Sequence, residues 1–200
     1  MISENFVIVG SIINLLGAIS YISDTLKGKV KPNRISWGLW SLAPLIAFAA
    51  EVKQGVGIQS LMTFTVGFIP FLIFISSFFN KKSYWKISRF DIYCGALSIL
   101  GLVFWYITKI GNIAILFSIF ADFMAGLPTV IKSYKYPETE NYVEFGSCTI
   151  SAVLTILTFK NWSFEYSAFP IYMLFFNLIV MLLIKFKLGK IYVNKLTIRS

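Results

Sequence analysis

Seven long apolar runs, separated by short polar connections, are the feature that most constrains how this chain can fold. Crossing the hydrocarbon core of a bilayer takes about 20 helical residues, with some tolerance for tilt and short ends. The runs lie at residues 6–24, 36–52, 58–79, 92–108, 113–131, 143–159 and 169–184. Because backbone groups in lipid must be paired within their own segment, we expect each run to be a helix.

The composition also favours a bilayer over water as the solvent of this chain. Hydrophobic residues make up 57% of the 200 residues and charged residues only 14%. A soluble helical domain needs a polar face on nearly every helix, and long stretches here offer none. The sequence contains no histidine, and Cys94 and Cys148 both lie inside apolar runs. We therefore expect an all-α membrane protein that is not an enzyme, with no disulfide, no metal and no cofactor.

Lysine and arginine are distributed unevenly among the connections, which predicts an orientation. One side receives 15 of the 18 basic residues, and the other receives only Lys53, Lys109 and Lys160. Basic loops stay in the cytoplasm, so the amino terminus is expected outside and the carboxyl terminus in the cytoplasm, most simply in the cell membrane. The net charge of +9 then reflects topology, and nucleic acid is not an expected partner.

A shift of 108 residues aligns positions 10–52 with positions 118–160 without a gap. Three pairs are identical, namely Lys27 with Lys135, Asn33 with Asn141 and Gly38 with Gly146. In the first run, Gly10, Asn14, Gly17 and Tyr21 share one helical face, and their equivalents are Ser118, Asp122, Ala125 and Thr129. Small residues on such a face also permit close helix packing, which is the simpler interpretation of the stripe.

The two copies are separated by one run, so both begin on the outside and have the same direction. We therefore expect two parallel three-helix bundles joined by a linker helix. The corresponding boundaries are 1–90 for the first unit with its basic loop, 91–109 for the linker, 110–186 for the second unit and 187–200 for a basic cytoplasmic tail. In transporters built from parallel repeats, the substrate lies near the midplane between them.

Two basic connections carry a family resemblance. They are DTLKGKVKPNRISWGLW after the first run and LPTVIKSYKYPETENYVEFG after the fifth. Both are similar to the hinge of the SWEET and PQ-loop (MtN3-like) transporter superfamily, and the resemblance covers roughly residues 6–185. It implies seven helices in a 3+1+3 order and transport of a small solute such as a sugar. Vitamin carriers of the PnuC type share the general architecture.

The sequence also departs from that family. The PQ dipeptide is absent from both repeats, because Thr129 follows Pro128 and Ser20 and Tyr21 occupy the equivalent place in the first repeat. Of the four hinge prolines that sugar carriers of the family use, Pro128 is retained and Pro44 is a candidate for a second. The resemblance also implies a solute contact for Asn177, which falls close to a pocket asparagine of the family.

Asp122 is the one acidic residue that we expect deep within a run. A charge at that depth costs roughly 2.5 to 3.5 kcal/mol on insertion scales, so something should offset it. Asp122 is predicted to contact substrate or to couple proton movement to transport. The alternative is a structural hydrogen bond, for instance to Asn14 across the interface between the repeats.

Other candidate residues supply flat or hydrogen-bonding surfaces. Trp37 and Trp40 could stack on a flat solute, although tryptophan also anchors helices at the membrane surface. Asn177 could orient hydroxyl or amide groups, or could only join two helices. Pro44, Pro70 and Pro128 are predicted hinges, with a static kink as the alternative.

The sequence thus predicts a transporter, either a facilitator or proton-coupled, for a small polar solute such as a sugar or amino acid. Its predicted substrate contacts are Asn14, Trp37, Trp40, Asp122 and Asn177. The alternative is a membrane receptor or sorting protein of the same fold, like the KDEL-receptor branch, that binds without transporting. Expected partners are the solute and the lipid bilayer, and assembly into a homo-oligomer is left open.

Overall fold

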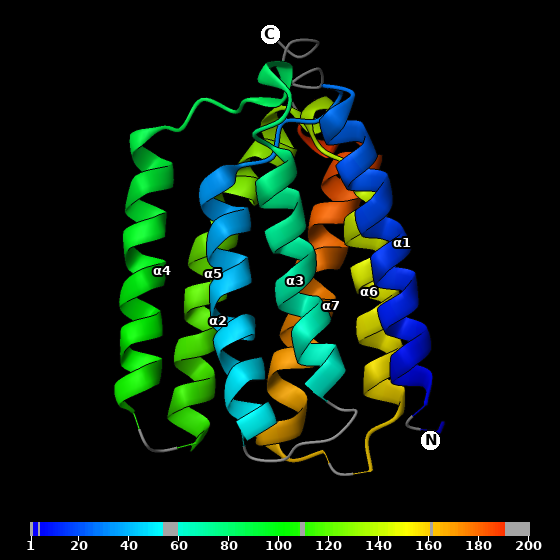
Figure 1. The fold of residues 1–200 in the computed structure, drawn as a ribbon, viewed down its shortest axis with the longest axis vertical. Helices are drawn as coiled ribbons and strands as arrows, with labels where there is room; N and C mark the ends of the chain where they lie inside the picture. Colours follow the sequence, from blue (N-terminus) through cyan, green and yellow to red (C-terminus); the bar gives the residue numbers. More distant parts are fainter. Residues whose placement is uncertain (1, 4, 54–59, 109–110, 161, 191–200) are drawn as a thin grey trace, which may run out of the picture.

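The computed structural model describes residues 2–3, 5–53, 60–108, 111–160 and 162–190, and these residues form seven α-helices and two 3-10 helices (Figure 1). The α-helices are α1 (Phe6–Leu26), α2 (Arg34–Lys53), α3 (Ser60–Ser76), α4 (Arg89–Ile107), α5 (Gly111–Lys135), α6 (Tyr142–Leu157) and α7 (Phe164–Lys185). The 3-10 helices are η1 (Lys81–Ser83) and η2 (Pro137–Thr139). The expectation of an all-α chain is confirmed for these residues. Most of the predicted tail, residues 191–200, lies outside them.

The outer surface of the helices is apolar. Within the described residues, four stretches are long and apolar enough to cross a membrane, namely Phe6–Leu26, Arg89–Ile107, Ile115–Lys135 and Ser167–Lys185. The described parts of α3 and α6 give shorter apolar helices, Phe64–Ser76 and Tyr142–Leu157. On α1, Leu16 is 61% exposed, whereas the opposite face buries Asn14 and Thr25. Such a surface is unfavourable in water and suits acyl chains, as expected of a membrane protein.

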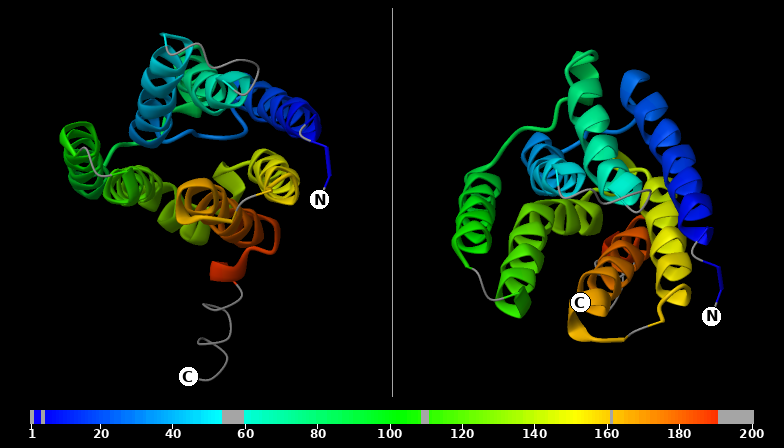
Figure 2. Two further views of the ribbon diagram at one scale, coloured as in Figure 1. Left: turned by 90° about the horizontal axis from the view of Figure 1, so that it is seen from below. Right: turned by 60° about the horizontal axis from the view of Figure 1, so that its bottom comes forward.

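The helices lie in two rows (Figure 2, left). In one row α3 contacts both α1 and α2, and in the other row α7 contacts both α5 and α6. Between the rows, α1 packs against α6 and α2 packs against α5. Helix α4 lies beside α5 and also touches α2. Helix α4, which covers most of the predicted linker at residues 91–109, lies outside both sets of three helices.

One end of the molecule carries the connections that follow α1, α3 and α5, together with the end of α7 (Figure 1). We call it the basic end and define it by residues 27–33, 77–88, 136–141 and 186–190. The opposite end, where α1 begins, is the N-terminal end. Most of the described lysine and arginine residues therefore cluster at one end of the bundle, as the charge distribution predicts.

Polar side chains determine where helices begin at the basic end. Asn33 accepts two backbone N–H groups in the first turn of α2, and Asn141 accepts one in the first turn of α6. At the start of α4, Ser88 and Asp91 form a reciprocal capping box. These bonds satisfy N–H groups that have no partner within the helix. Asn33 and Asn141 are an identical pair under the 108-residue shift, and both residues cap the second helix of their row.

Contacts between the rows are reciprocal under the same alignment. Asn14 on α1 accepts a hydrogen bond from the Cys148 thiol on α6 at 3.0 Å. The equivalent of Asn14 is Asp122 on α5, and its backbone carbonyl accepts from the indole N–H of Trp40 on α2 at 3.2 Å. Trp40 and Cys148 are themselves equivalent positions. Each row thus presents the same helix face to the other.

The third identical pair faces the same neighbour within each row. A Cβ added to Gly38 would meet the Phe74 ring of α3 at 3.4 Å. A Cβ added to Gly146 would meet the Met181 sulfur of α7 at 3.2 Å. Both glycines therefore allow the second helix of a row to approach the third closely.

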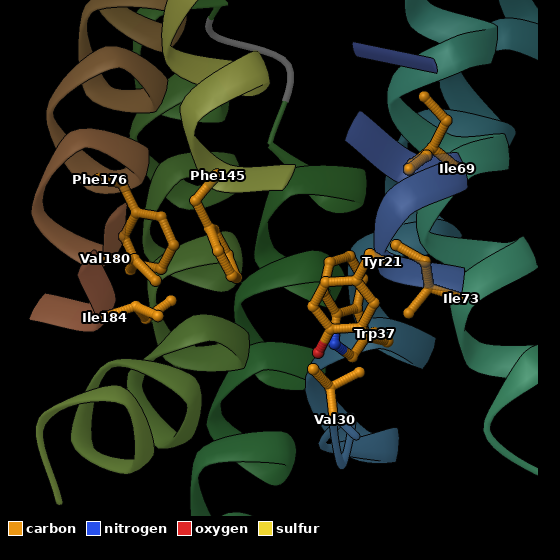
Figure 3. Close-up of a cluster of buried hydrophobic side chains, with 10 residues drawn as sticks. Tyr21, Val30, Trp37, Ile69, Ile73, Phe145, Phe176, Val180 and Ile184 are labelled. Atoms are coloured by element: carbon orange, nitrogen blue, oxygen red, sulfur yellow. The ribbon is translucent and has the colours of Figure 1, made fainter. Parts of the chain in front are cut away.

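Buried hydrophobic side chains from both rows meet towards the basic end (Figure 3). Phe145, Phe176, Val180 and Ile184 come from α6 and α7, and they face side chains from the other row. Across the interface, the Trp37 and Phe145 rings lie 6.1 Å apart. These two positions are equivalent under the shift, so the two rows meet at matching places.

Candidate functional site

A cavity of about 420 Å³ lies between the two rows, and all seven α-helices contribute to its lining. This volume is typical of sites for small molecules. Its lining is mostly aliphatic and aromatic. The residues that add polar groups are Asn14, Ser98, Ser118, Asp122, Glu144, Cys148, Ser151, Thr155 and Asn177.

All the residues predicted to contact a solute line this cavity, namely Asn14, Trp37, Trp40, Asp122 and Asn177. Among the predicted hinges, Pro44 and Pro70 also line it, whereas Pro128 lies inside α5 away from the lining. A further proline, Pro170, lies inside α7 and lines the cavity. Pro170 was missed because the seventh run was expected to begin at residue 169, next to it, whereas α7 begins five residues earlier.

Asp122 is held by the second row. Its carboxylate accepts a hydrogen bond from the Tyr172 hydroxyl of α7 at 2.7 Å. The hypothesis of a hydrogen bond between Asp122 and Asn14 is wrong, because each side chain has a different partner. The two residues occupy equivalent positions, but the Asn14 side chain bonds to α6 of the opposite row, whereas the Asp122 carboxylate bonds to α7 of its own row. The Tyr172 contact offsets part of the cost of burying a carboxylate.

Asn14 lies on a tightly packed helix face. The side chain is 7% exposed, and its carbonyl accepts from the Cys148 thiol. On either side of it, a Cβ at Gly10 would lie 3.0 Å from the Ser151 hydroxyl and a Cβ at Gly17 would lie 1.9 Å from that of Ser147. The stripe on α1 is therefore a packing surface against α6, and Asn14 is the polar member that reaches the cavity.

The two tryptophans are interior residues. Trp37 is 3% exposed and packs against the Tyr21 ring at a centroid distance of 4.9 Å. Trp40 is half-buried and meets Trp37 edge to face at 5.1 Å and Phe176 at 5.9 Å. Trp37 therefore does not anchor the helix at a membrane surface, and both rings form part of the cavity wall.

Asn177 is 5% exposed and donates through its amide nitrogen to the Met173 carbonyl one turn earlier in α7 at 2.8 Å. This bond fixes the side chain against its own helix. Asn177 and Met173 both line the cavity. The contact therefore does not join two helices, and it leaves the amide oxygen of Asn177 as an acceptor for other groups.

Glu144 is the functional candidate that the sequence interpretation missed. It is 2% exposed and lines the cavity. One carboxylate oxygen lies 3.6 Å from the Cys148 sulfur, whose one proton is shared with the closer Asn14 carbonyl, and the other oxygen has no hydrogen-bond partner among the described residues. Glu144 was passed over because it lies two residues into the predicted run 143–159, where a charged residue is expected at the membrane surface. Asp122 is thus not the only acidic residue buried within a run.

A second polar cluster closes the molecule beyond the cavity, at the basic end. The Lys132 ammonium pairs with Glu140 at 2.7 Å, and both side chains are at most 1% exposed. The Tyr21 hydroxyl donates to the other Glu140 oxygen at 2.6 Å. Lys132 also donates to the backbone carbonyl of Lys31 and lies over the Trp85 ring. The sequence interpretation had counted Lys132 as an ordinary loop cation.

This cluster joins the rows. Tyr21 and Lys31 belong to the first row and its connection, whereas Lys132 and Glu140 belong to the second. A backbone hydrogen bond from Lys31 N–H to the Thr139 carbonyl at 2.9 Å adds to the connection. The cavity is therefore closed on this side by two layers, first the Trp37 and Phe145 rings and then the charged cluster.

The electrostatics of the cavity are one-sided. Its lining contains two carboxyl groups, Asp122 and Glu144, and no lysine or arginine among the residues that the structure describes. Neither carboxylate takes part in an ion pair within that part of the chain. The described residues also contain no cluster of three histidine, cysteine, aspartate or glutamate side chains that could hold a metal ion.

Comparison with known proteins adds no assignment: no protein-family model, no curated protein and no solved structure matches the chain. The class that the fold and the site define is a helical, membrane-type protein with an internal cavity. Any more specific function must therefore be argued from the geometry.

Proposed function

We propose that this protein is a membrane transporter that moves a small polar solute by alternating access between two parallel three-helix units, α1–α3 and α5–α7, with α4 as the linker. The observation that carries the proposal is the cavity between two rows whose contacts are reciprocal under the 108-residue shift. A solute site at such an interface is typical of transporters built from parallel repeats. The likeness of the two connections to the PQ-loop hinge supports the same architecture.

The charge distribution supports an orientation with the basic end in the cytoplasm. Residues of the cavity lining extend from the first turns of α2 and α6 towards the N-terminal end, where Trp105 and Thr155 lie near the ends of their helices. The cluster around Lys132 and Glu140 closes the cytoplasmic side. In this proposal the structure represents a state from which solute is exchanged with the outside.

Alternating access requires the rows to separate at the basic end while they approach each other at the N-terminal end. The prolines inside α2, α3, α5 and α7 remove backbone hydrogen bonds and are suited to bend these helices. The contacts that must break are the Tyr21–Glu140 hydrogen bond, the Lys132–Lys31 contact and the Lys31–Thr139 backbone bond. A cross-link there should stop transport.

The experiment uses proteoliposomes and a variant in which Cys94 and Cys148 are replaced by serine and Lys31 and Thr139 by cysteine. The backbone hydrogen bond brings these two positions close enough for a disulfide. The solute is one selected by thermal stabilisation from a panel of sugars, amino acids, vitamins and amines. Oxidation should abolish uptake and counterflow, and a reductant should restore both. Each single-cysteine variant is the control.

Two results would count against the proposal. Undiminished flux through fully cross-linked protein would exclude opening of the basic end. Tight binding without any counterflow in the uncross-linked protein would favour the alternative, a receptor or sorting protein of the same fold.

Proton coupling is tested separately at Asp122. If Asp122 loads and releases the coupled proton, Asp122→Asn should abolish uptake driven by a pH gradient and leave counterflow in place. The comparison of two flux modes in one folded variant separates coupling from folding. Equal gradient-driven uptake by wild type and Asp122→Asn would reject the role, and transport would then be passive.

A further inference from the structure

The unbalanced charge of the cavity restricts what it can bind. Asp122 on α5 and Glu144 on α6 belong to the second row and line the same cavity. Asp122 is partly compensated by the Tyr172 hydroxyl. No ammonium or guanidinium group from the described residues lines that space. A buried carboxylate requires a counter-charge, a hydrogen-bond donor or a proton.

Glu144 is the less compensated of the two. Its thiol contact with Cys148 is long and weak at 3.6 Å, and its second oxygen has no partner in the described part of the chain. The carboxylate lies against Gly17 of α1, because a Cβ at that position would come within 3.0 Å of the unpartnered oxygen. Glu144 is 2% exposed and lines the cavity. Its unpartnered carboxylate oxygen is suited to accept a hydrogen bond from a donor group of a ligand.

Aromatic rings surround the same space. Phe145 follows Glu144 directly in α6, and the edge-to-face pair Trp37 and Trp40 forms the wall contributed by α2. The Phe176 ring of α7 packs edge to face against the Trp40 ring, with their centroids 5.9 Å apart. The faces of such rings attract cations through the ring quadrupole, most strongly for tryptophan. Carboxylates and indole rings therefore favour the same kind of ligand.

We propose that the cavity selects a small organic cation, a protonated amine or a quaternary ammonium, with Glu144 as its anionic anchor and Asp122 as a second carboxylate contact. This inference deepens the proposed function and rests on it only in taking the cavity as the solute site. An anion is excluded because it would meet two carboxyl groups and, among the described lining residues, no compensating cation. A neutral polyol would leave the charge of both carboxylates uncompensated.

The first arm of the test uses the intact wild-type protein in nanodiscs and three ligands of similar shape and different charge. Cyclohexylamine, cyclohexanol and cyclohexanecarboxylate are compared by calorimetry at pH 7, together with choline, putrescine and glucose. The amines and choline should bind at least tenfold more tightly than the neutral and acidic ligands. Equal or tighter binding of cyclohexanol or glucose, or no binding of any cation in the panel, would overturn the proposal.

The second arm compares three substitutions that each remove one carboxylate. Glu144→Gln should weaken binding of the cations at least tenfold without changing the affinity for cyclohexanol, and Asp122→Asn should weaken it less. Glu138→Gln is the matched control, because Glu138 is half-exposed and pairs with Lys190 away from the cavity. Unchanged cation affinity in Glu144→Gln would remove Glu144 as the anchor. The first arm tests the proposal even where a variant does not fold.

Flux measurements distinguish this inference from the proposed function. Cation-selective binding without counterflow would leave the inference in place and reject transport. Counterflow of a neutral sugar without effect of any amine would support transport and reject the inference.

Discussion

The two rows share one backbone plan and differ in the chemistry they bring to the cavity. The first row supplies the amide of Asn14 and the indoles of Trp37 and Trp40. The second row supplies both carboxylates, with Asp122 at the position equivalent to Asn14 and Glu144 at the position equivalent to Ser36. Contacts that fix the helix arrangement, such as the two asparagine caps, recur in both rows. The polar residues that line the cavity differ between equivalent positions.

This difference separates the structural role of the repeat from its functional role. Residues that keep both copies in the same shape are identical or similar, because each copy has the same helix packing to satisfy. Polar residues that line the cavity differ between the copies, as an asymmetric ligand would require. The polar groups of the cavity therefore lie at positions where the two rows carry different residues.

The largest expected effect is at the charged cluster, where the rows differ most. Lys132 corresponds to Asp24 in the first row, so among the described residues the buried cation comes from the second row alone. Lys132→Met should lower the free energy of unfolding by about 3 to 5 kcal/mol, because it leaves Glu140 buried without its counter-charge. Lys135→Met, on the same helix but exposed, is the control. Thermal unfolding in detergent measures the stability of both variants. Equal losses of stability would show that burial of Lys132 beside Glu140 does not stabilise the protein.

The next effect concerns close packing between the rows. Gly17→Ala should cost about 1 to 3 kcal/mol, because the added Cβ would lie 1.9 Å from the Ser147 hydroxyl and 2.7 Å from its Cβ. Gly10→Ala should cost less, since its nearest contact is at 3.0 Å. The equivalent of Gly17 in the second row is already alanine, Ala125. Comparable melting temperatures for the two glycine variants would contradict the packing described for α1 and α6.

A smaller and equal effect is expected at the two helix caps. Asn33→Ala and Asn141→Ala should each cost about 1 to 2 kcal/mol, because each removes a side-chain acceptor from the first turn of its helix. Each also removes an amide donor to an aspartate, Asp91 for Asn33 and Asp24 for Asn141. The exposed Asn112 near the start of α5 serves as the control. Chemical unfolding of the three variants gives the comparison. A loss of unfolding free energy in only one of the two asparagine variants would mean that the aligned asparagines do not stabilise their helices equally.

The smallest effect is expected at the surface pair of Glu138 and Lys190, which are 2.7 Å apart and half-exposed. The Lys190 ammonium lowers the pKa of the Glu138 carboxyl. Because the pKa is lower in the folded state, the stabilisation is present above the unfolded pKa and is lost as pH falls through the folded pKa. Glu138→Gln should cost less than about 0.5 kcal/mol at pH 7. The difference from wild type should vanish at pH 3, and a difference that grows on acidification would contradict the sign.

Most of the fold was predictable because each apolar run became one helix. The cavity residues could also be named, since Asn14, Asp122 and Asn177 are polar groups in the middle of such runs. The repeat placed Asn14 and Asp122 at equivalent depths. It did not determine their partners, because those depend on which helix of the opposite row packs against each one.

The residues that could not be predicted are charged groups near the ends of runs. Glu144, Lys132 and Glu140 have the sequence surroundings of loop residues. Glu140 and Glu144 lie on either side of the Asn141 cap of α6, and Lys132, in the last turn of α5, is buried against Glu140. How deeply a helix starts is a property of packing between elements, and local hydropathy does not report it.

The proposed arrangement is one in which lipid surrounds the helices and a cavity that contains a few polar groups separates the rows. It is tested by the rate at which single cysteines react with a membrane-impermeant thiol reagent in a variant with Cys94 and Cys148 replaced by serine. Ser151→Cys, at a position 9% exposed in the cavity wall, should react rapidly from the outside, whereas Leu16→Cys, at a position 61% exposed on α1, should not. Faster reaction at position 16 would contradict the account.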